Sequence, residues 1–323
     1  MIAHYAFGVA AALGAGAANN AGMLAQKIAV NRLPAAGGNR GRPGSSLFLR
    51  LLRTPLWLAG AAVVVLVGAP LNVVAALSLG PAILPGLMSL GLVVLTVGAV
   101  TVAGERLGAA DVAGIALVMS GIALVGASRL RIDVAAEGMH APALLVRLAI
   151  FTLCTVSLSA GLLAAAAKSR GARGPLRALS SGLWFAPSNL WLAVVMNALN
   201  HWLEGAPIRE GLALAAVVLV VILASSLTGT VVLQYAYRDG NVSRVVPIQM
   251  VPQQLVPILA FLIVFRETPP SAAALPLAVG GAALILTGAG LLAGRQATTG
   301  TSKPRRSHGR RLGAATTGTP RQG

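Results

Sequence analysis

Long apolar runs recur along the whole of this 323-residue chain. Hydrophobic residues make up 56% of it and charged residues only 10%, whereas a soluble protein carries about 25% charge. A membrane-spanning helix needs about 20 apolar residues, and hydrocarbon admits only helices and closed barrels. We therefore expect an all-α integral membrane protein with about nine transmembrane helices. The predicted spans are 4–28, 55–78, 81–103, 109–128, 143–167, 178–203, 211–236, 245–265 and 271–293.

One long segment occurs twice. Asn72, Pro85 and Glu105 recur 162 positions later as Gln234, Pro247 and Glu267. Each Glu precedes an apolar helix with two glycines seven residues apart: Gly114 and Gly121, then Gly281 and Gly288. The pattern predicts two four-helix repeats, 1–128 and 178–294, joined by a linker, 129–177, that holds the fifth span. Because the linker crosses the membrane once, an odd number of times, the second repeat has the opposite orientation to the first. Inverted repeats are typical of secondary transporters that bind solute at the repeat interface.

Basic residues indicate the orientation. If the N-terminus is outside, the cytoplasmic segments hold 20 of the 25 Lys and Arg and three of the eight acids. This asymmetry follows the positive-inside rule and places the C-terminus in the cytoplasm of a multi-pass protein of the cell membrane. We expect the basic loop 31–53 to be mobile and the tail 295–323 to be disordered. The tail has no aromatic residues to stack bases, so its charge does not indicate nucleic-acid binding.

Two stretches carry a family resemblance. Leu79-Gly80-Pro81-Ala82-Ile83-Leu84-Pro85, followed by Gly104-Glu105-Arg106-Leu107, resembles the EamA-like proteins of the drug/metabolite transporter (DMT) superfamily. The second copy agrees in Leu233-Gln234-Tyr235-Ala236-Tyr237, Val246-Pro247-Ile248 and Phe265-Arg266-Glu267. The nine-span layout and the long basic loop are most similar to the magnesium-transporter NIPA branch. Over residues 4–294, the resemblance implies a transporter, with Glu105 and Glu267 as structural signatures and Mg²⁺ as the leading specific substrate.

Polar side chains within the spans are the candidates for a substrate pathway. Such groups are costly in hydrocarbon unless they face protein, water or substrate. The alternative role is hydrogen bonding between helices. Prolines reshape the backbone and free carbonyl oxygens, and the span 245–265, with three of them, is predicted to be a broken helix. The pathway candidates are Asn19, Asn20, Gln26, Asn72, Asn189, Gln234, Gln249 and Gln253, and the helix-breaking candidates are Pro85, Pro247 and Pro252. Asn20 and Asn189 are candidate equivalents in the two repeats.

The sequence offers little other chemistry. Every acid lies at a span end or in a loop, so a buried carboxylate for proton coupling is not predicted, and Mg²⁺, which prefers carboxylates, has no strong site. Cys154 is the only cysteine, and no catalytic motif is present, so we expect neither an enzyme nor a cofactor. His201 and Glu204 form a weak candidate metal site at the outer face.

The sequence thus predicts a DMT-type secondary transporter that moves a small polar solute or ion by alternating access. The alternative is a membrane scaffold or partner subunit that does not transport. The expected partners are the lipid bilayer and a small polar solute or cation. Nucleic acid is not expected, and a homodimer is left open.

Cysteine labelling tests the predicted orientation. In a Cys154→Ala background, Arg40→Cys and Ala172→Cys should react with a membrane-impermeant thiol reagent only from the cytoplasmic side, because both lie in predicted basic inner segments. Labelling of either position only from outside would contradict the inverted-repeat prediction.

Overall fold

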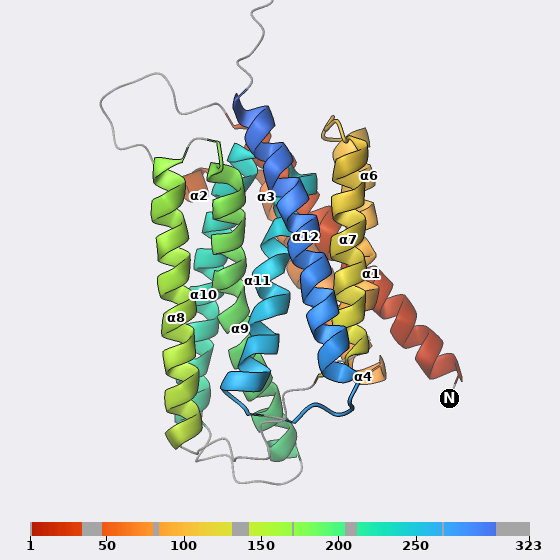
Figure 1. Cartoon of the computed structure of the whole chain (residues 1–323), viewed down its shortest axis with the longest axis vertical. Coiled ribbons are helices and arrows are strands. Elements are labelled where there is room, and N and C mark those ends of the chain that lie inside the picture. Colours follow the sequence, from red (N-terminus) through yellow and green to blue (C-terminus); the bar gives the residue numbers. More distant parts are fainter. Residues whose placement is uncertain are drawn as a thin grey trace, which may run out of the picture.

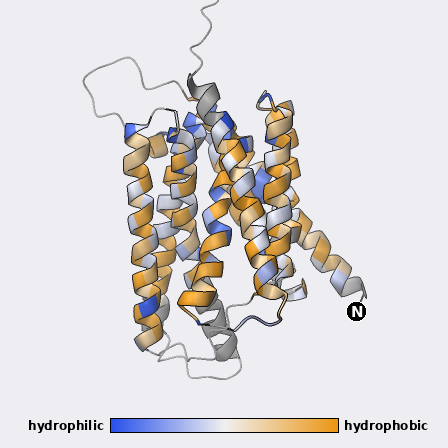
Figure 2. Ribbon diagram, in the orientation of Figure 1, coloured by the Kyte–Doolittle hydropathy of each residue, from blue (hydrophilic) through white to orange (hydrophobic). Residues whose placement is uncertain are grey.

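A computed structural model describes residues 2–33, 47–79, 84–130, 142–169, 171–203, 212–266 and 268–301. Over these ranges the chain folds into helices and contains no strand. Six helices within them are long and apolar enough to cross a membrane: Pro55–Ala75, Ala109–Ala127, Pro142–Lys168, Val218–Asp239, Val242–Ile263 and Ala274–Arg295. Hydrophobic residues cover the helices along most of their length, and hydrophilic ones gather mainly near one end (Figure 2). The prediction of an all-helical, membrane-embedded protein is confirmed.

Helices occupy each predicted interval over the described part of the chain. They are α1 (Ile2–Arg32), α2 (Leu47–Leu51), α3 (Pro55–Ala62), η1 (Val63–Gly68), α4 (Ala69–Leu79), α5 (Leu84–Ser89), α6 (Gly91–Thr101), α7 (Ala109–Ala127), α8 (Pro142–Lys168), α9 (Arg173–Leu203), α10 (Leu212–Asp239), α11 (Val242–Ile263) and α12 (Ala274–Thr301). Figure 1 shows them as one bundle of mostly upright helices. We call α1 to α7 the N-terminal group and α9 to α12 the C-terminal group. A count of nine transmembrane spans stays a prediction.

The span with three prolines, predicted to be a broken helix, is continuous. α11 runs unbroken through Pro247, Pro252 and Pro257. Most of its residues are buried, and α9 packs so closely on it that a Cβ added to Gly182 would lie 2.1 Å from the carbonyl oxygen of Gln249. Proline removes a helical hydrogen bond and usually kinks a helix. We attribute the continuity of α11 to this enclosure by its neighbours.

Irregular backbone occurs instead in the N-terminal group. The predicted span 81–103 is divided at Leu90, which separates α5 from α6. The predicted span 55–78 contains a π-helical segment, η1, between α3 and α4. π-Helical turns are uncommon and are frequent at functional sites. The second and third predicted spans are therefore the irregular ones.

Two expected irregular segments are partly helical. α12 continues to Thr301, so the predicted disordered tail does not begin at residue 295. The predicted mobile loop 31–53 includes the short helix α2, whose Leu47 and Leu51 are buried. Residues 34–46 and 302–323, which complete these two predictions, lie outside the described residues.

The two groups have the same order of packing. In the N-terminal group, α1 packs on α3, η1 and α4 and on α5 and α6, and α5 packs on α7. In the C-terminal group, α9 packs on α10 and α11, and α11 packs on α12. α8 lies against α9, and α7 contacts α12 extensively. One hydrophobic core, which includes Leu92, Ile115, Val246 and Ile285, joins the groups.

Four glycines bring the α7 and α12 backbones together. A Cβ on Gly121 would lie 2.6 Å from the carbonyl oxygen of Gly281, and one on Gly288 would lie 2.5 Å from that of Gly114. The reverse contacts are similarly short, so the helices run antiparallel with the glycine pairs facing each other. Small residues allow such close approach in membranes. The glycines identified as a repeated pattern thus form the contact between the groups.

A single methyl group should disturb this contact. Gly281→Ala must push α12 away from the carbonyl oxygen of Gly121, because its Cβ would lie 2.6 Å from that atom. Overpacking costs about 1–3 kcal/mol, so the thermal unfolding midpoint in detergent should fall by roughly 5 °C. Gly290→Ala is the matched control on the same helix, because no atom lies within 4 Å of its added Cβ. Equal midpoints for the two variants would contradict a tight α7–α12 contact.

Candidate functional site

Two predicted pathway residues meet between the groups. Gln26 on α1 and Gln234 on α10 are buried, and the Nε2 atom of Gln234 donates a hydrogen bond of 2.8 Å to the Oε1 atom of Gln26. They come from opposite halves of the sequence, 208 positions apart. A bond between neutral amides can break and re-form at modest energy, about 1 kcal/mol. This amide bridge is therefore a polar contact that a small solute could replace.

Several buried amides keep an oxygen atom without a hydrogen-bond partner. Over the described residues these atoms include Oδ1 of Asn20, Oε1 of Gln234 and Oε1 of Gln249. Only 3%, 1% and 2% of these respective residues is exposed. A buried acceptor without a partner costs about 1–3 kcal/mol. These acceptors, on α1, α10 and α11, are therefore not satisfied by the surrounding described residues.

Asn19 and Asn20, both predicted pathway residues, face different neighbours. The Nδ2 atom of Asn20 donates to the carbonyl oxygen of Gly16 at 2.8 Å, and the Asn20 side chain lies against Gly91 of α6. The Oδ1 atom of Asn19 lies against Gly68 of η1, 2.1 Å from where a Cβ would be. Consecutive helical residues point in directions about 100° apart, which explains the divergence. Asn20 stays in the candidate site, whereas Asn19 belongs to the contact between α1 and η1.

The other predicted residues have varied surroundings. Asn189 is exposed on α9, while Asn20 is buried, so their environments do not support the suggested equivalence. Asn72 and Gln253 are half-buried, although the Oδ1 atom of Asn72 is itself buried without a partner. Pro247 and Pro252 are buried within α11, and Pro85 lies in α5. The side chains of Pro85 and His201, and the whole of Glu204 and Glu267, lie outside what the structure describes.

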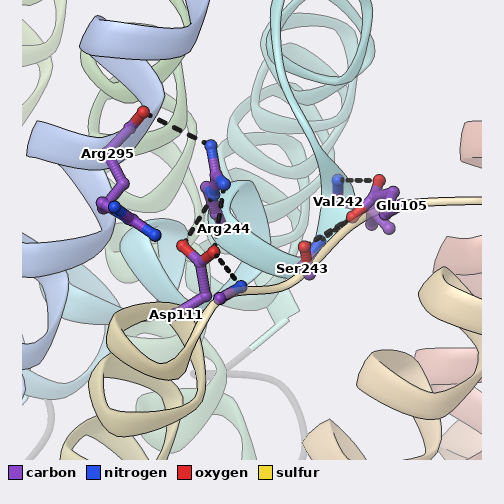
Figure 3. Close-up of polar contacts among 7 residues, drawn as sticks. Glu105, Asp111, Val242, Ser243, Arg244 and Arg295 are labelled. Atoms are coloured by element: carbon purple, nitrogen blue, oxygen red, sulfur yellow. Dashed lines mark hydrogen bonds and ion pairs between the residues drawn. The ribbon is translucent and has the colours of Figure 1, made fainter.

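A second polar cluster lies at one end of the bundle, which we call the basic end because Lys27, Arg177, Arg244 and Arg295 meet there. Glu105, which follows α6, reaches across to the start of α11 (Figure 3). Its carboxylate accepts hydrogen bonds from the backbone nitrogen atoms of Val242 at 2.7 Å and Ser243 at 3.2 Å, and from the Ser243 hydroxyl group. A carboxylate at a helix N-terminus satisfies free N–H groups and the helix dipole. The expected structural role of Glu105 thus has a definite geometry.

The chain turns sharply before Glu105. Gly104 has φ of +69°, a conformation that glycine adopts without penalty. The turn directs Glu105 toward α11, and a Cβ added to Gly104 would meet no atom within 4 Å.

Asp111 and Arg244 form a buried ion pair beside Glu105. The Nε and Nη2 atoms of Arg244 donate to the two carboxylate oxygen atoms of Asp111 at 2.9 and 3.1 Å (Figure 3). The side chains are 6% and 0% exposed for Arg244 and Asp111, respectively. Asp111 also accepts a bond from the Gly108 nitrogen at 2.9 Å, and Arg244 donates to the carbonyl oxygen of Arg295 at 3.4 Å. Bidentate geometry fixes the orientation of the two side chains, and through them the position of α7 against α11.

Lys27 completes the basic end. Its ammonium group donates to the carbonyl oxygen of Gly240 at 2.6 Å and to that of Tyr237, although the residue is only 5% exposed. These carbonyls lie at and just beyond the C-terminal end of α10, where a cation is favoured by the helix dipole. Lys27 follows Gln26, so the charged cluster begins next to the amide bridge.

Sequence reasoning counted Lys27, Asp111 and Arg244 only as charges that set the topology. A usable signal existed for Asp111, which stands three residues after Gly108 in the first turn of an apolar helix, where an acid commonly caps the N-terminus. No pattern indicated that Arg244 would be its partner, because 133 positions separate them.

Comparisons of the chain with models of protein families, with curated proteins and with solved structures found no match.

Breaking the buried pair on one side should destabilise the fold. Arg244→Gln leaves the Asp111 carboxylate buried without its guanidinium group, a change that typically costs about 3–5 kcal/mol. The double variant Asp111→Asn with Arg244→Gln should be more stable than Arg244→Gln, because no uncompensated charge remains. Thermal unfolding in detergent measures both.

The control is Arg177→Gln. Arg177 pairs with Asp239 at 2.5 Å, but these side chains are 25% and 21% exposed, so we expect a smaller loss. A loss for Arg244→Gln no greater than for Arg177→Gln would contradict the importance of the buried pair.

Proposed function

We propose that this protein is a DMT-type secondary transporter that moves a small polar solute or ion across the cell membrane by alternating access. The observation that carries the proposal is the set of buried amides on α1, α10 and α11 whose oxygen atoms lack partners over the described residues. In hydrocarbon such groups are expensive unless they serve a pathway. A purely structural amide would be expected to satisfy its oxygen through a neighbouring helix, as Gln26 does.

Inverted repeats are the second part of the proposal, and matched backbone geometry supports them. α6 ends at Thr101 and α11 at Ile263, again 162 positions apart. Gly104 and Arg266, also 162 apart, both have positive φ, at +69° and +53°. The last turns have the same double hydrogen bonds: Val102 and Ala103 donate to Gly98, and Val264 and Phe265 donate to Ala260.

The antiparallel contact of α7 and α12 agrees with this symmetry. The first glycine of one pattern faces the second glycine of the other: Gly114 faces Gly288, and Gly121 faces Gly281. A two-fold axis between two related helices produces this reciprocal pairing. Two groups related in this way can rock about their shared contact and expose a central site to each side in turn.

The site in this proposal consists of Asn20, Gln26, Gln234 and Gln249. Amides supply both donors and acceptors without charge, so they can replace part of a solute's hydration. Asn20 lies seven residues before Lys27 on the same face of α1, which places it about 10 Å deeper than the basic end. A solute held there is inside the bundle.

Mg²⁺ is the specific substrate that the family resemblance favours, and it is the first ion to test. The three acids of the basic end already have partners: Glu105 at the start of α11, Asp111 on Arg244 and Asp239 on Arg177. Mg²⁺ holds its water tightly. It would therefore pass as a hydrated ion along the amide and carbonyl oxygen atoms.

The experiment is a profile of metabolites and metals in cells that lack the protein, compared with the same cells complemented by it. Any solute or ion whose level differs is then tested for uptake into liposomes that contain the purified protein, with Mg²⁺ always included. We expect uptake that exceeds that of protein-free liposomes. Identical profiles and no uptake of the tested solutes would favour the alternative, a membrane scaffold that does not transport.

Shape-conserving substitutions test the site. Asn20→Leu and Gln249→Met keep the side-chain size but remove the amide, so we expect uptake to fall to the protein-free level while the protein still inserts and folds. Thr287→Val is the control, because Thr287 is exposed on α12 and its hydroxyl group bonds only within its own helix, to Ala283. Normal uptake by both amide variants would mean that these residues serve only helix packing.

A further inference from the structure

We propose that Lys27, Glu105 and the Asp111–Arg244 pair form a gate, and that the structure is the state in which this gate closes the pathway at the basic end. The inference deepens the proposed function, since it rests on a pathway between the two helix groups. It assigns a role in the transport cycle to charged residues that topology alone does not explain.

Three contacts of the gate join one helix group to the other. Lys27 of α1 bonds to the end of α10 and to Gly240. Glu105, just beyond α6, bonds to the first two residues of α11. Asp111 of α7 bonds to Arg244 of α11. These contacts must separate if the groups move apart at this end.

Three charged residues of the gate are buried away from water. Asp111, Arg244 and Lys27 are 0%, 5% and 5% exposed. Burial of three charges near a helix end, where water would otherwise reach them, requires that the two groups fit tightly there. Lys27 follows Gln26, and Tyr237 stands one helical turn beyond Gln234, so the gate covers the amide bridge directly. A solute among the amides could not leave past this end in the observed state.

Polar contacts suit a gate because they can open reversibly. The attraction within a buried ion pair is largely offset by the loss of hydration, so the charges regain most of that energy from water when they separate. The Asp111–Arg244 pair and the Glu105 contact thus hold the end closed with a modest net preference. The backbone contact of α7 with α12 has no such compensation, and it serves as the pivot.

The test uses a reporter that requires no knowledge of the solute. In a Cys154→Ala background, Gln249→Cys places a thiol on a residue that is 2% exposed and stands five residues after Arg244 on α11. Sealed vesicles of both orientations are treated with a membrane-impermeant thiol reagent. Ala172→Cys, beside the start of α9, identifies the vesicles whose basic end faces the reagent.

With the gate intact, Gln249→Cys should react slowly from the basic end. The double change Asp111→Asn with Arg244→Gln, and separately Glu105→Gln, should raise that rate about tenfold, because weakening the closed state increases the open population. Arg177→Gln is the matched control, since its ion pair with Asp239 lies within the C-terminal group. Unchanged labelling in both gate variants, or an equal rise in the control, would overturn the proposal.

A cross-link gives a second test of closure. Glu105→Cys with Ser243→Cys replaces a carboxylate and a hydroxyl group that are in direct contact. A short bifunctional thiol reagent should join them. The cross-linked protein should lose solute uptake and recover it when the link is cleaved. This test therefore needs no thiol at residue 249. Uptake that persists in fully cross-linked protein would contradict the gate.

The two proposals can fail separately. If the gate variants raise the labelling rate of Gln249→Cys but no solute is transported, the movement is real and the transport function is wrong. If uptake is found and Asn20→Leu abolishes it, but the gate variants do not change the labelling rate of Gln249→Cys, the transport function stands and the gate is wrong. Gel filtration of each variant checks that it is folded.

Discussion

Hydrocarbon provides no hydrogen-bond partner, and this constraint governs the placement of polar groups throughout the chain. Backbone groups satisfy it by forming helices. Most serines and threonines satisfy it by bonding within their own helix or to a neighbour, as Ser159 does with Ser180. The exceptions are therefore informative: seven buried side-chain atoms have no partner over the described residues, and the amide oxygen atoms of Asn20, Gln234 and Gln249 are among them. The proposed pathway follows from these exceptions.

Two of the contacts that join the helix groups differ in how easily they can separate. The glycine contact between α7 and α12 is a close fit of backbones, which any separation would lose. The charged contacts at the basic end exchange protein partners for water when they part. A rigid contact along one side and exchangeable contacts at one end are what a rocking movement requires. The fold thus supplies a pivot and a gate from interactions of different physical character.

Sequence reasoning predicted the helical class and the apolar spans, because each depends on composition. It found the repeated glycines from their spacing, but not that they would face each other across α7 and α12. It also selected Gln26 and Gln234, but it did not predict that they would be hydrogen-bonded to each other. It was wrong about a break in α11, since burial between neighbouring helices outweighs the local effect of three prolines. It missed the Asp111–Arg244 pair, because a contact between residues 133 positions apart leaves no local pattern. It selected both Asn19 and Asn20 for the pathway, although helical geometry points them at different neighbours.

The central claim is that the two groups move relative to each other at the basic end while their glycine contact stays fixed. Distances between spin labels in lipid test it directly. One pair, Arg106→Cys with Arg238→Cys, spans the groups at two exposed positions of the basic end, and a second, Val112→Cys with Gly290→Cys, spans α7 and α12. The account predicts two distance populations for the first pair, shifted toward the longer by Glu105→Gln, and one unshifted population for the second. A single distance for the first pair that Glu105→Gln leaves unchanged would contradict it.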